Sequence, residues 1–293
     1  MTVYSFPAKS TWKVARHMEM CMDIKANGYM GVFNPRVFQK EKYKWVYYVV
    51  EWVLDDMEID YVNSSPKPLI PASYWVKFLS RNYRYEVVHH EVPYYTYTAP
   101  KVDYKLGDFD FFAVSYSLIR KTPYVLITWA NNTRHKGVIF ADKMVCLQIH
   151  NPNVKCMDFG VQDEALLRYM YEHAKTYVFL SGDEGFGLPP LEATYFRRPV
   201  IAYPIMPFLE WHERDSFTIP DKYVKLDGVY QDGTLHPVAL PTDLESVVKF
   251  VEDMVGKEPD EKTLKTIERV RTEYVNCYQY NKIKALLHKY GIY

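Results

Sequence analysis

The chain has 293 residues, 48% of them apolar, and its 36 basic side chains balance 36 acidic ones. This length suggests two domains or one large one, with ample apolar content for a core. Balanced charge excludes a global positive field that would attract nucleic acid, so we expect no nucleic-acid partner. The longest apolar run, residues 45–54, is about half the length that spans a bilayer, so we expect at most peripheral membrane contact.

The four cysteines are scattered along the chain and form no CxxC pair: Cys21, Cys146, Cys156 and Cys277. This spacing argues against a zinc site and against a disulfide framework. The first seven residues are too short for a secretory signal and are followed by charged residues. We therefore expect unpaired cysteines in a reducing compartment, and a cytoplasmic location.

The first half of the chain alternates short apolar runs with helical stretches. Strands are expected at residues 3–6, 29–33, 45–50 and 86–89. Helices are expected at residues 10–26 and at 73–80, the second capped by Ser73. Strands that alternate with helices indicate a parallel sheet with crossover connections.

The alternation breaks between Pro93 and Pro123, which we interpret as an interdomain connection. It resumes at Tyr124 with expected strands at 125–128, 145–149, 177–180 and 199–202. A helix is expected to end near Lys143, and further helices are expected at 164–173, capped by Asp163, at 244–255, and at 264–290, with a possible break near Asn276. The second half therefore predicts a second parallel sheet, more complete than the first.

The most informative segment is residues 181–193, SGDEGFGLPPLEA. Two carboxylates, Glu184 and Glu192, flank a Gly-Phe-Gly turn and two consecutive prolines, between an expected strand and an expected helix. Proline suits the first helical turn, where a missing N–H costs nothing. Gly185 and Gly187 allow the backbone to approach a ligand closely. The amides at a helix start form an anion site, so the layout suits a phosphate between two hydroxyl-rich rings.

This segment, followed by Pro199-Val-Ile-Ala, resembles the donor-site signature of family-4 retaining glycosyltransferases of the GT-B fold. Other stretches follow the family's order: residues 71–79, 87–93, 131–137, 159–160 and 205–210. The resemblance is specific over residues 124–215 and loose elsewhere. It implies an α/β fold with two Rossmann-like domains facing across a cleft, the N-terminal one reduced to about a hundred residues.

The resemblance also implies the domain boundaries. We expect a reduced acceptor-side domain at 1–110, with a linker to about 123, and a nucleotide-sugar-binding domain at 124–275. A terminal helix at 276–293 would pack back on the first domain, as it does in the family.

The chemistry implied is glycosyl transfer from a nucleotide-diphosphate sugar, with retention and without a metal or other cofactor. The basic loop offers Arg134 and Lys136 to stabilise the leaving diphosphate. The amides from Phe186 to Leu188 would add fixed dipoles. Glu184 would hold the hydroxyls of the donor sugar and act with the two cations in catalysis. Glu192 would hold the ribose, because a carboxylate accepts two hydroxyl hydrogens.

The acceptor is open: a glycan, a lipid, a protein or a small molecule. Glu51, after an apolar run, is an acceptor-side candidate, with core-edge packing an equal alternative. Ser10 is the other, since residues 7–10 replace the glycine pair often found after the family's first strand. Two alternative functions stay open: a nucleotide-sugar-binding protein without turnover, and a nucleotide-sugar epimerase or phosphorylase on the same fold.

Overall fold

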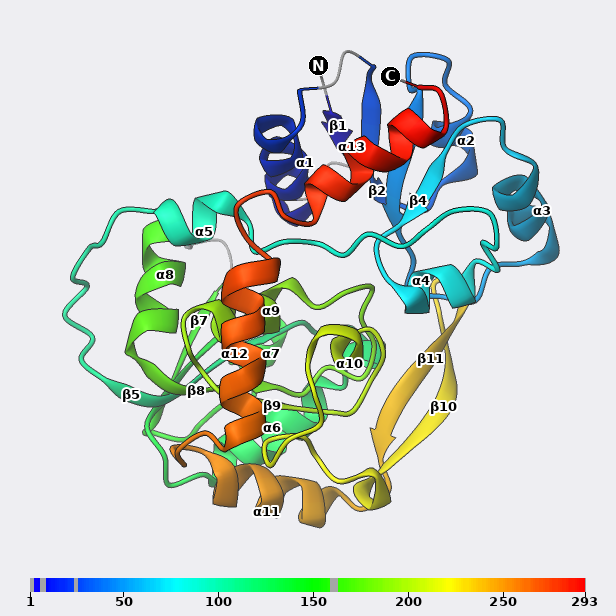
Figure 1. Cartoon of the computed structure of the whole chain (residues 1–293). Coiled ribbons are helices and arrows are strands. Elements are labelled where there is room, and N and C mark those ends of the chain that lie inside the picture. The colour runs from blue at the N-terminus through cyan, green and yellow to red at the C-terminus, as the bar shows by residue number, and fades with distance from the viewer. Residues whose placement is uncertain (1–2, 6–8, 24–25, 159–162, 293) are drawn as a thin grey trace. The chain divides into compact units, whose positions relative to one another are not determined.

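The computed structural model describes residues 3–5, 9–23, 26–158 and 163–292. The chain divides into two compact units, each treated separately below (Figure 1). Unit 1 comprises Met1–Tyr95 and Arg271–Tyr293, and unit 2 comprises Thr96–Val270. The sequence placed the corresponding boundaries at 110 and 123, later than the structure does.

Unit 1 contains a four-stranded parallel sheet in the order β1-β2-β3-β4. Its strands are β1 (Val3–Ser5), β2 (Gly28–Val32), β3 (Trp45–Val49) and β4 (Leu69–Pro71). Its helices are α1 (Lys9–Cys21), α2 (Pro35–Phe38), α3 (Asp56–Ser64), α4 (Tyr74–Leu79) and α13 (Tyr280–Lys289), and α5 (Tyr94–Thr98) runs into unit 2. The aromatic residues of β3 are buried, as a strand covered on both faces requires.

Unit 2 contains a five-stranded parallel sheet in the order β7-β6-β5-β8-β9. Its strands are β5 (Phe109–Ser115), β6 (Gly137–Ala141), β7 (Val154–Asp158), β8 (Ala174–Phe179) and β9 (Val200–Ala202). The chain winds outward from β5 to β7, then returns to the other side of β5 and continues through β8 to β9. The winding direction therefore reverses between β5 and β8, which is the switch point of an open α/β sheet.

Helices and one hairpin complete unit 2. The helices are α6 (Pro123–Asn132), α7 (Lys143–Cys146), α8 (Glu164–His173), α9 (Leu188–Tyr195), α10 (Phe208–Trp211), α11 (Leu244–Met254) and α12 (Glu261–Glu273), whose end reaches unit 1. Among the described residues, η1 (Ile119–Lys121) and η3 (Asp221–Tyr223) are 3-10 turns. Strands β10 (Val224–Gln231) and β11 (Thr234–Pro241) form an antiparallel hairpin, the yellow-to-orange ribbon of Figure 1.

The sequence signals with a local cause agree with the structure. Ser73 caps α4, where its Oγ accepts a hydrogen bond from the Val76 amide at 3.0 Å. Asp163 caps α8 in the same way through the Leu166 amide at 2.6 Å. The C-terminal helical tract breaks where expected, since Asn276 has a φ of 54°. The expected strands at 29–33, 45–50, 177–180 and 199–202 correspond to β2, β3, β8 and β9.

Three expected strands are wrong. Residues 125–128 lie in α6 and residues 145–149 begin in α7, while residues 86–89 form no strand. A run of four apolar residues does not distinguish a strand from a buried turn of helix. In α6 the buried residues Val125, Leu126, Trp129 and Ala130 recur at helical spacing and cover one face.

The central strand of unit 2 lies in the segment that the sequence analysis interpreted as a linker. β5 (Phe109–Ser115) pairs with both β6 and β8, and Phe111, Phe112 and Ala113 within it are fully buried. Aspartates and tyrosines around this short strand conceal it in the sequence. Unit 2 consequently begins at Thr96 rather than at 124.

The cysteine prediction is also wrong. Cys21 pairs with Cys277, and Cys146 pairs with Cys156, with Cα–Cα distances of 5.2 and 5.3 Å. The first pair is separated by 256 residues, so spacing along the chain gives no sign of it. Disulfides are typical of oxidising compartments. The cytoplasmic location stays a prediction, and the cysteines no longer support it. None of the helices that the structure describes has the length and hydrophobicity needed to cross a membrane.

A buried histidine gives unit 1 a predicted pH dependence. His90 is 2% exposed and packs edge-on against Tyr47, with ring centroids 5.0 Å apart. Burial, with a smaller contribution from His89, lowers the pKa of His90 from 6.5 to about 3. His90 therefore binds a proton below about pH 6.5 in the unfolded chain, but only below about pH 3 in the folded chain. The free energy of unfolding is therefore unaffected by this protonation above about pH 6.5 and decreases as the pH falls from 6.5 towards 3. Between pH 7 and pH 5 the expected decrease is about 2 kcal/mol.

Urea unfolding of the wild type and of His90→Phe at pH 7 and pH 5 measures the contribution of His90 to the pH dependence of the free energy of unfolding. The variant lacks the titrating group, so its free energy of unfolding is expected to change less between the two pH values. His150→Gln, which alters an exposed histidine, is the matched control and should behave as the wild type does. Equal pH sensitivity of His90→Phe and the wild type would contradict the assignment.

Candidate active site

The functional segment of unit 2 lies at the switch point of its sheet. β5 and β8 are parallel neighbours, with Ala113 opposite Val178 near their carboxyl ends. Beyond β5 the chain forms η1 (Ile119–Lys121), and beyond β8 it forms the glycine loop, residues 181–187. In open α/β sheets, ligands bind outside the carboxyl ends of the strands at this point. The fold therefore brings η1 and the glycine loop together where a ligand is expected.

The glycine loop depends on two glycines for different reasons. Gly187 is the N-cap of α9 and has a φ of 86°, in the left-handed region that favours glycine. Gly182 approaches β11 closely: its carbonyl accepts a hydrogen bond from the Ala239 amide at 2.8 Å, and a Cβ there would lie 2.6 Å from the Ala239 carbonyl oxygen. The loop is thus fixed by a helix start on one side and by the hairpin on the other.

Glu184 is held by two groups at the switch point. Its Oε1 accepts a hydrogen bond from Ser181 Oγ at 2.7 Å and lies 3.0 Å from Lys121 Nζ. Lys121 also donates to the carbonyl oxygen of Asp183. The side chains of Lys121 and Glu184 are 8% and 18% exposed, so their attraction is only weakly screened by solvent. The sugar-binding role of Glu184 stays a prediction, to which the structure adds Lys121 as an ion-pair partner.

A second charged cluster lies under the loop. Asp183 Oδ2 lies 3.0 Å from an Arg120 guanidinium nitrogen and 3.0 Å from His236 Nδ1. The Asp183 side chain is 1% exposed. A buried charge needs such partners, because removing one leaves an uncompensated charge in the interior. Asp183 therefore links η1, the glycine loop and the hairpin into one charged network.

Backbone strain marks the same place. Thr122, directly after Lys121, has a φ of 48°, which is unusual for a β-branched residue. Its Oγ1 donates a hydrogen bond to the Leu180 carbonyl at 2.7 Å, next to the glycine loop. Strain of this kind persists only where the surroundings fix the backbone, and it concentrates at functional sites. Thr122 thus fastens the end of η1 to the end of β8.

Glu192 lies deeper than the sequence suggested. It is 5% exposed, and its two carboxylate oxygens accept hydrogen bonds from the hydroxyls of Thr96 and Tyr171, both at 2.9 Å. Burial, reinforced by the charge of Glu192, raises the pKa of Tyr171 well above 10, so its hydroxyl stays a donor. These two hydrogen bonds hold the Glu192 carboxylate against α8 and the start of unit 2.

The predicted donor-binding backbone forms the start of α9, and its side chains are partly core. The Phe186 ring is 3% exposed and packs on Trp211, with centroids 6.5 Å apart and the ring planes 29° from parallel, so this side chain belongs to the core. Leu188 is the first helical residue. The two prolines after it carry no N–H, so few amides are left to bind an anion at this helix start. Gly185 is buried within the loop.

The structure does not bring Arg134 and Lys136 to this site. They precede β6, whose first residue, Gly137, pairs with Phe111 near the start of β5. All five strands are parallel, so the basic loop lies at the amino edge of the sheet and the glycine loop at its carboxyl edge. Arg134 is 78% exposed there, with its Nε 3.4 Å from Glu252. The prediction that these cations face the glycine loop is wrong because the strand assigned before them is helix α6.

Arg120 and Lys121 are the cations that the sequence analysis missed. The signal was present as a basic pair followed by Thr-Pro, a common helix start. It becomes informative only once residues 109–115 are known to be the strand before it. Because residues 125–128 were misassigned as a strand, the sequence analysis chose cations that lie at the amino edge of the sheet instead of those at its carboxyl edge.

The acceptor-side candidates lie in unit 1. Glu51 lies two residues beyond the carboxyl end of β3 and is half-buried. Ser10 lies in the first turn of α1, and its side chain is outside what the structure describes. Residues 159–160, part of the family resemblance, are outside the described residues as well. Neither candidate is tested by the structure.

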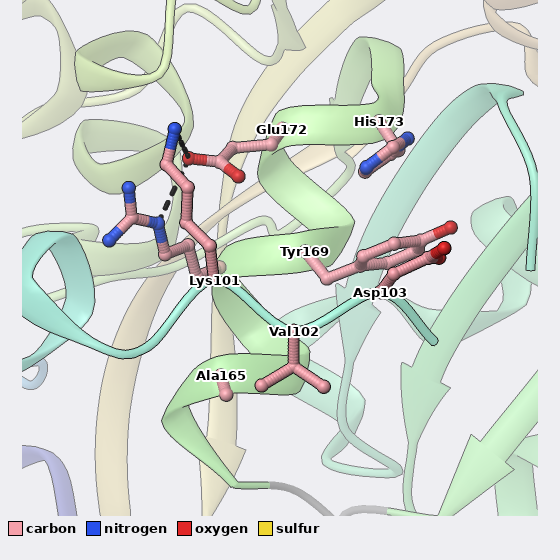
Figure 2. A pocket seen from close by; sticks show the side chains of 8 residues that line it. Lys101, Val102, Asp103, Ala165, Tyr169, Glu172 and His173 are labelled. Carbon is pink, nitrogen blue, oxygen red and sulfur yellow. Dashed lines mark hydrogen bonds and ion pairs between the residues drawn. The ribbon is translucent and has the colours of Figure 1, made fainter. Parts of the chain in front are cut away.

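A hollow of about 240 Å³ lies elsewhere on unit 2, beside α8 (Figure 2). Its charged lining is paired internally: Glu172 Oε1 lies 2.9 Å from Arg168 Nε and 3.8 Å from Lys101 Nζ. His173 stacks on Tyr169 with centroids 4.0 Å apart, and its Nδ1 lies 2.9 Å from Asp108. These residues adjoin the start of β8, away from the glycine loop at its other end, and we assign the hollow no role.

The network under the loop gives a testable result. Replacing His236 by alanine removes one partner of the buried Asp183 and one contact between hairpin and loop. Loss of one partner from a buried charge destabilises by roughly 3–5 kcal/mol when the charge is fully buried. We expect a lower unfolding midpoint in urea and weaker ligand binding at the loop. His236→Asn, which keeps a hydrogen-bond donor, should recover part of both, whereas equal midpoints for wild type and alanine variant would contradict the network.

One family of known proteins matches part of unit 2. Residues 141–216 match the family described as glycosyl transferases group 1. This range covers β7 to β9, the glycine loop and α9. No curated protein sequence matches the chain.

Solved structures of glycosyltransferases share the fold. HepE of Anabaena, solved in complex with UDP and glucose, superposes with a TM-score of 0.63 at 11% identity, covering 99% of both chains. TarM of S. aureus, in complex with fondaparinux, α-GlcNAc-glycerol and UDP, gives a TM-score of 0.59 at 16% identity over 96% of this chain. The pneumococcal O-GlcNAc transferase GtfA, in complex with UDP and GlcNAc, gives 0.57 at 12% identity over 97%.

At these identities the likeness establishes the fold, which is that of the GT-B glycosyltransferases: α/β with two parallel sheets. The chain spans 58% of the length of TarM and 61% of that of GtfA. It is thus shorter than those two chains and similar in extent to HepE.

Proposed function

We propose that this protein transfers a glycosyl group from a nucleotide-diphosphate sugar to an acceptor. The observation that carries the proposal is the Lys121–Glu184 pair, 3.0 Å apart and partly buried, at the switch point of the unit 2 sheet. A cation and a carboxylate there suit a ligand that carries both a diphosphate and sugar hydroxyls. The group 1 match covers the glycine loop with Glu184 and supports this proposal from that side of the site.

The leaving diphosphate is the chief demand of the reaction, because negative charge accumulates on it as the glycosidic bond breaks. Lys121 supplies a point charge, and Arg120, its neighbour in η1, adds a second cation to the field. The Leu188 amide at the start of α9 contributes a fixed dipole. Preorganised groups of this kind typically contribute about 3 kcal/mol each to lowering a barrier. Two cations in this position support transfer without a metal.

The two carboxylates would hold the sugars. Glu184 would accept hydrogen bonds from hydroxyls of the transferred sugar, and Glu192 would accept them from the hydroxyls of the ribose. Retention follows if the acceptor attacks on the face from which the diphosphate departs, a route that needs no enzymic nucleophile. We place acceptor recognition, with Glu51 and Ser10 as its candidates, on unit 1.

We expect the donor nucleotide to be UDP, since HepE, TarM and GtfA were each solved in complex with UDP. The sugar is expected to be a hexose or a derivative of one. Calorimetric titration against UDP-, GDP- and ADP-sugars tests donor class and base together. UDP-sugars should bind, and a tight-binding donor should be hydrolysed or transferred when sugar acceptors are supplied.

Three outcomes of that screen have distinct meanings. Turnover that persists in excess chelator supports metal-independent transfer. Binding without hydrolysis or transfer indicates a nucleotide-sugar-binding protein. Absence of binding by every activated sugar contradicts the proposal.

A further inference from the structure

A buried histidine lies beside the Cys21–Cys277 pair in unit 1. One imidazole nitrogen of His17 and the two cysteine sulfurs all lie within 4.8 Å of one another. His17 and Cys21 are four residues apart on α1, so they share one face of that helix. Cys277 lies in the break between α12 and α13, where its φ is 67°. The fold thus gathers three soft or borderline donors from two distant segments.

The surroundings of His17 differ for its two ring nitrogens. The residue is 2% exposed, and its Nδ1 is buried and makes no hydrogen bond within the described residues. Its Nε2 faces Glu91 Oε2 at 3.5 Å. An imidazole nitrogen left unpaired in the interior costs free energy, and such atoms are rare. A metal-binding histidine typically directs its second nitrogen at a carboxylate while the first binds the ion.

Glu91 is itself rigidly held. Its carboxylate accepts hydrogen bonds from the backbone amides of Cys277 at 3.0 Å, Gln279 at 2.6 Å and Tyr280 at 3.3 Å. It is fully buried, so these bonds fix its position. A fixed carboxylate in turn fixes the orientation of the His17 ring. Support of this second layer is what a preorganised metal site requires.

We propose that, once the Cys21–Cys277 disulfide is reduced, Cys21, Cys277 and His17 bind a zinc ion. A dithiol reductant supplies two electrons and two protons: the sulfur–sulfur bond breaks, two thiols form, and the reductant becomes a disulfide. Zinc then displaces the two thiol protons to solvent. Cys21 and Cys277 are half-buried, so water completes the tetrahedral site at the fourth position.

The geometry accommodates this change with little backbone movement. Sulfurs bound to one tetrahedral zinc at about 2.3 Å lie roughly 3.7 Å apart. With a Cα–Cα distance of 5.2 Å, rotation of the two side chains reaches that separation. The same residues therefore join α1 to the start of α13 in both redox states, by a disulfide when oxidised and by zinc when reduced.

The test uses the full chain with the other disulfide removed, because reduced Cys146 and Cys156 would also bind metal. In the Cys146→Ser/Cys156→Ser background, the protein is reduced with dithiothreitol, freed of reductant without air, and titrated with Co²⁺ as a spectroscopic probe and with Zn²⁺ by calorimetry. We expect about one ion per chain, with the visible absorption of tetrahedral thiolate-bound cobalt, and none in the oxidised protein.

Two further variants decide which residues bind. Cys21→Ser should abolish the thiolate-cobalt spectrum, and His17→Gln should weaken zinc binding by about tenfold or more. His288→Gln, in the same unit, is the control and should bind as the parent does. Circular dichroism confirms that each variant folds. The proposal is overturned if reduced parent protein binds no cobalt, or if His17→Gln binds with unchanged spectrum and affinity.

Discussion

Glu184→Gln is expected to lower kcat by about a hundredfold or more, because the change removes the charge that we propose holds the donor sugar and breaks the ion pair with Lys121. UDP affinity should be retained or rise, since Lys121 is then released from a competing carboxylate. Turnover with the best donor and calorimetric titration with UDP separate the two effects. Loss of kcat with intact UDP binding is the specific signature of a group that acts on the sugar rather than on the nucleotide.

A matched control is available on the same unit. Glu258 is exposed in the loop before α12, and Glu258→Gln makes the same chemical change away from the site. It should leave kcat and UDP affinity unchanged. Unfolding midpoints of both variants show whether any loss reflects folding. Wild-type turnover in Glu184→Gln would remove this residue from the sugar site.

Lys121→Met is expected to weaken UDP binding by about 10- to 100-fold, the range for loss of a charge-assisted hydrogen bond at a poorly solvated site. Methionine keeps the apolar stem of a side chain that is 8% exposed, so packing is largely preserved. Uridine lacks the diphosphate, and its affinity should change little. Calorimetry with UDP and with uridine gives the comparison directly.

Lys136→Met tests the sequence-based prediction that Lys136 stabilises the leaving diphosphate. Lys136 is exposed at the amino edge of the sheet, so this variant should bind UDP as the wild type does. The pair of variants distinguishes the two sheet edges with one chemical change. Weaker UDP binding in Lys136→Met than in Lys121→Met would return the diphosphate to the basic loop and contradict the site described above.

The motif at residues 181–193 was predictable because its causes are local. A strand, a turn that needs glycine at positive φ, and prolines in a first helical turn each depend on neighbours within a few residues. The Ser73 and Asp163 caps belong to the same class. The sequence therefore determined which loop carries the candidate site and that Glu184 lies in it.

The partners of that loop come from distant segments and were not predictable. Lys121 reaches Glu184 across 63 positions only because β5 and β8 are sheet neighbours, and strand order is not written in local pattern. His236 lies on strand β11 of the hairpin and contacts Asp183, and no short sequence motif predicts this contact. Arg134 and Lys136 were misplaced for the converse reason, since one run misinterpreted as a strand moves its following loop to the wrong edge.

Sequence by itself thus determined the α/β class, the glycine loop and its two acids, because backbone geometry and capping act over a few residues. Tertiary structure alone decided which cations face that loop, how deeply Glu192 is buried, and that Cys21 meets Cys277. These are contacts between segments far apart in the chain. Their formation depends on the packing of whole strands and helices, which no window of neighbouring residues encodes.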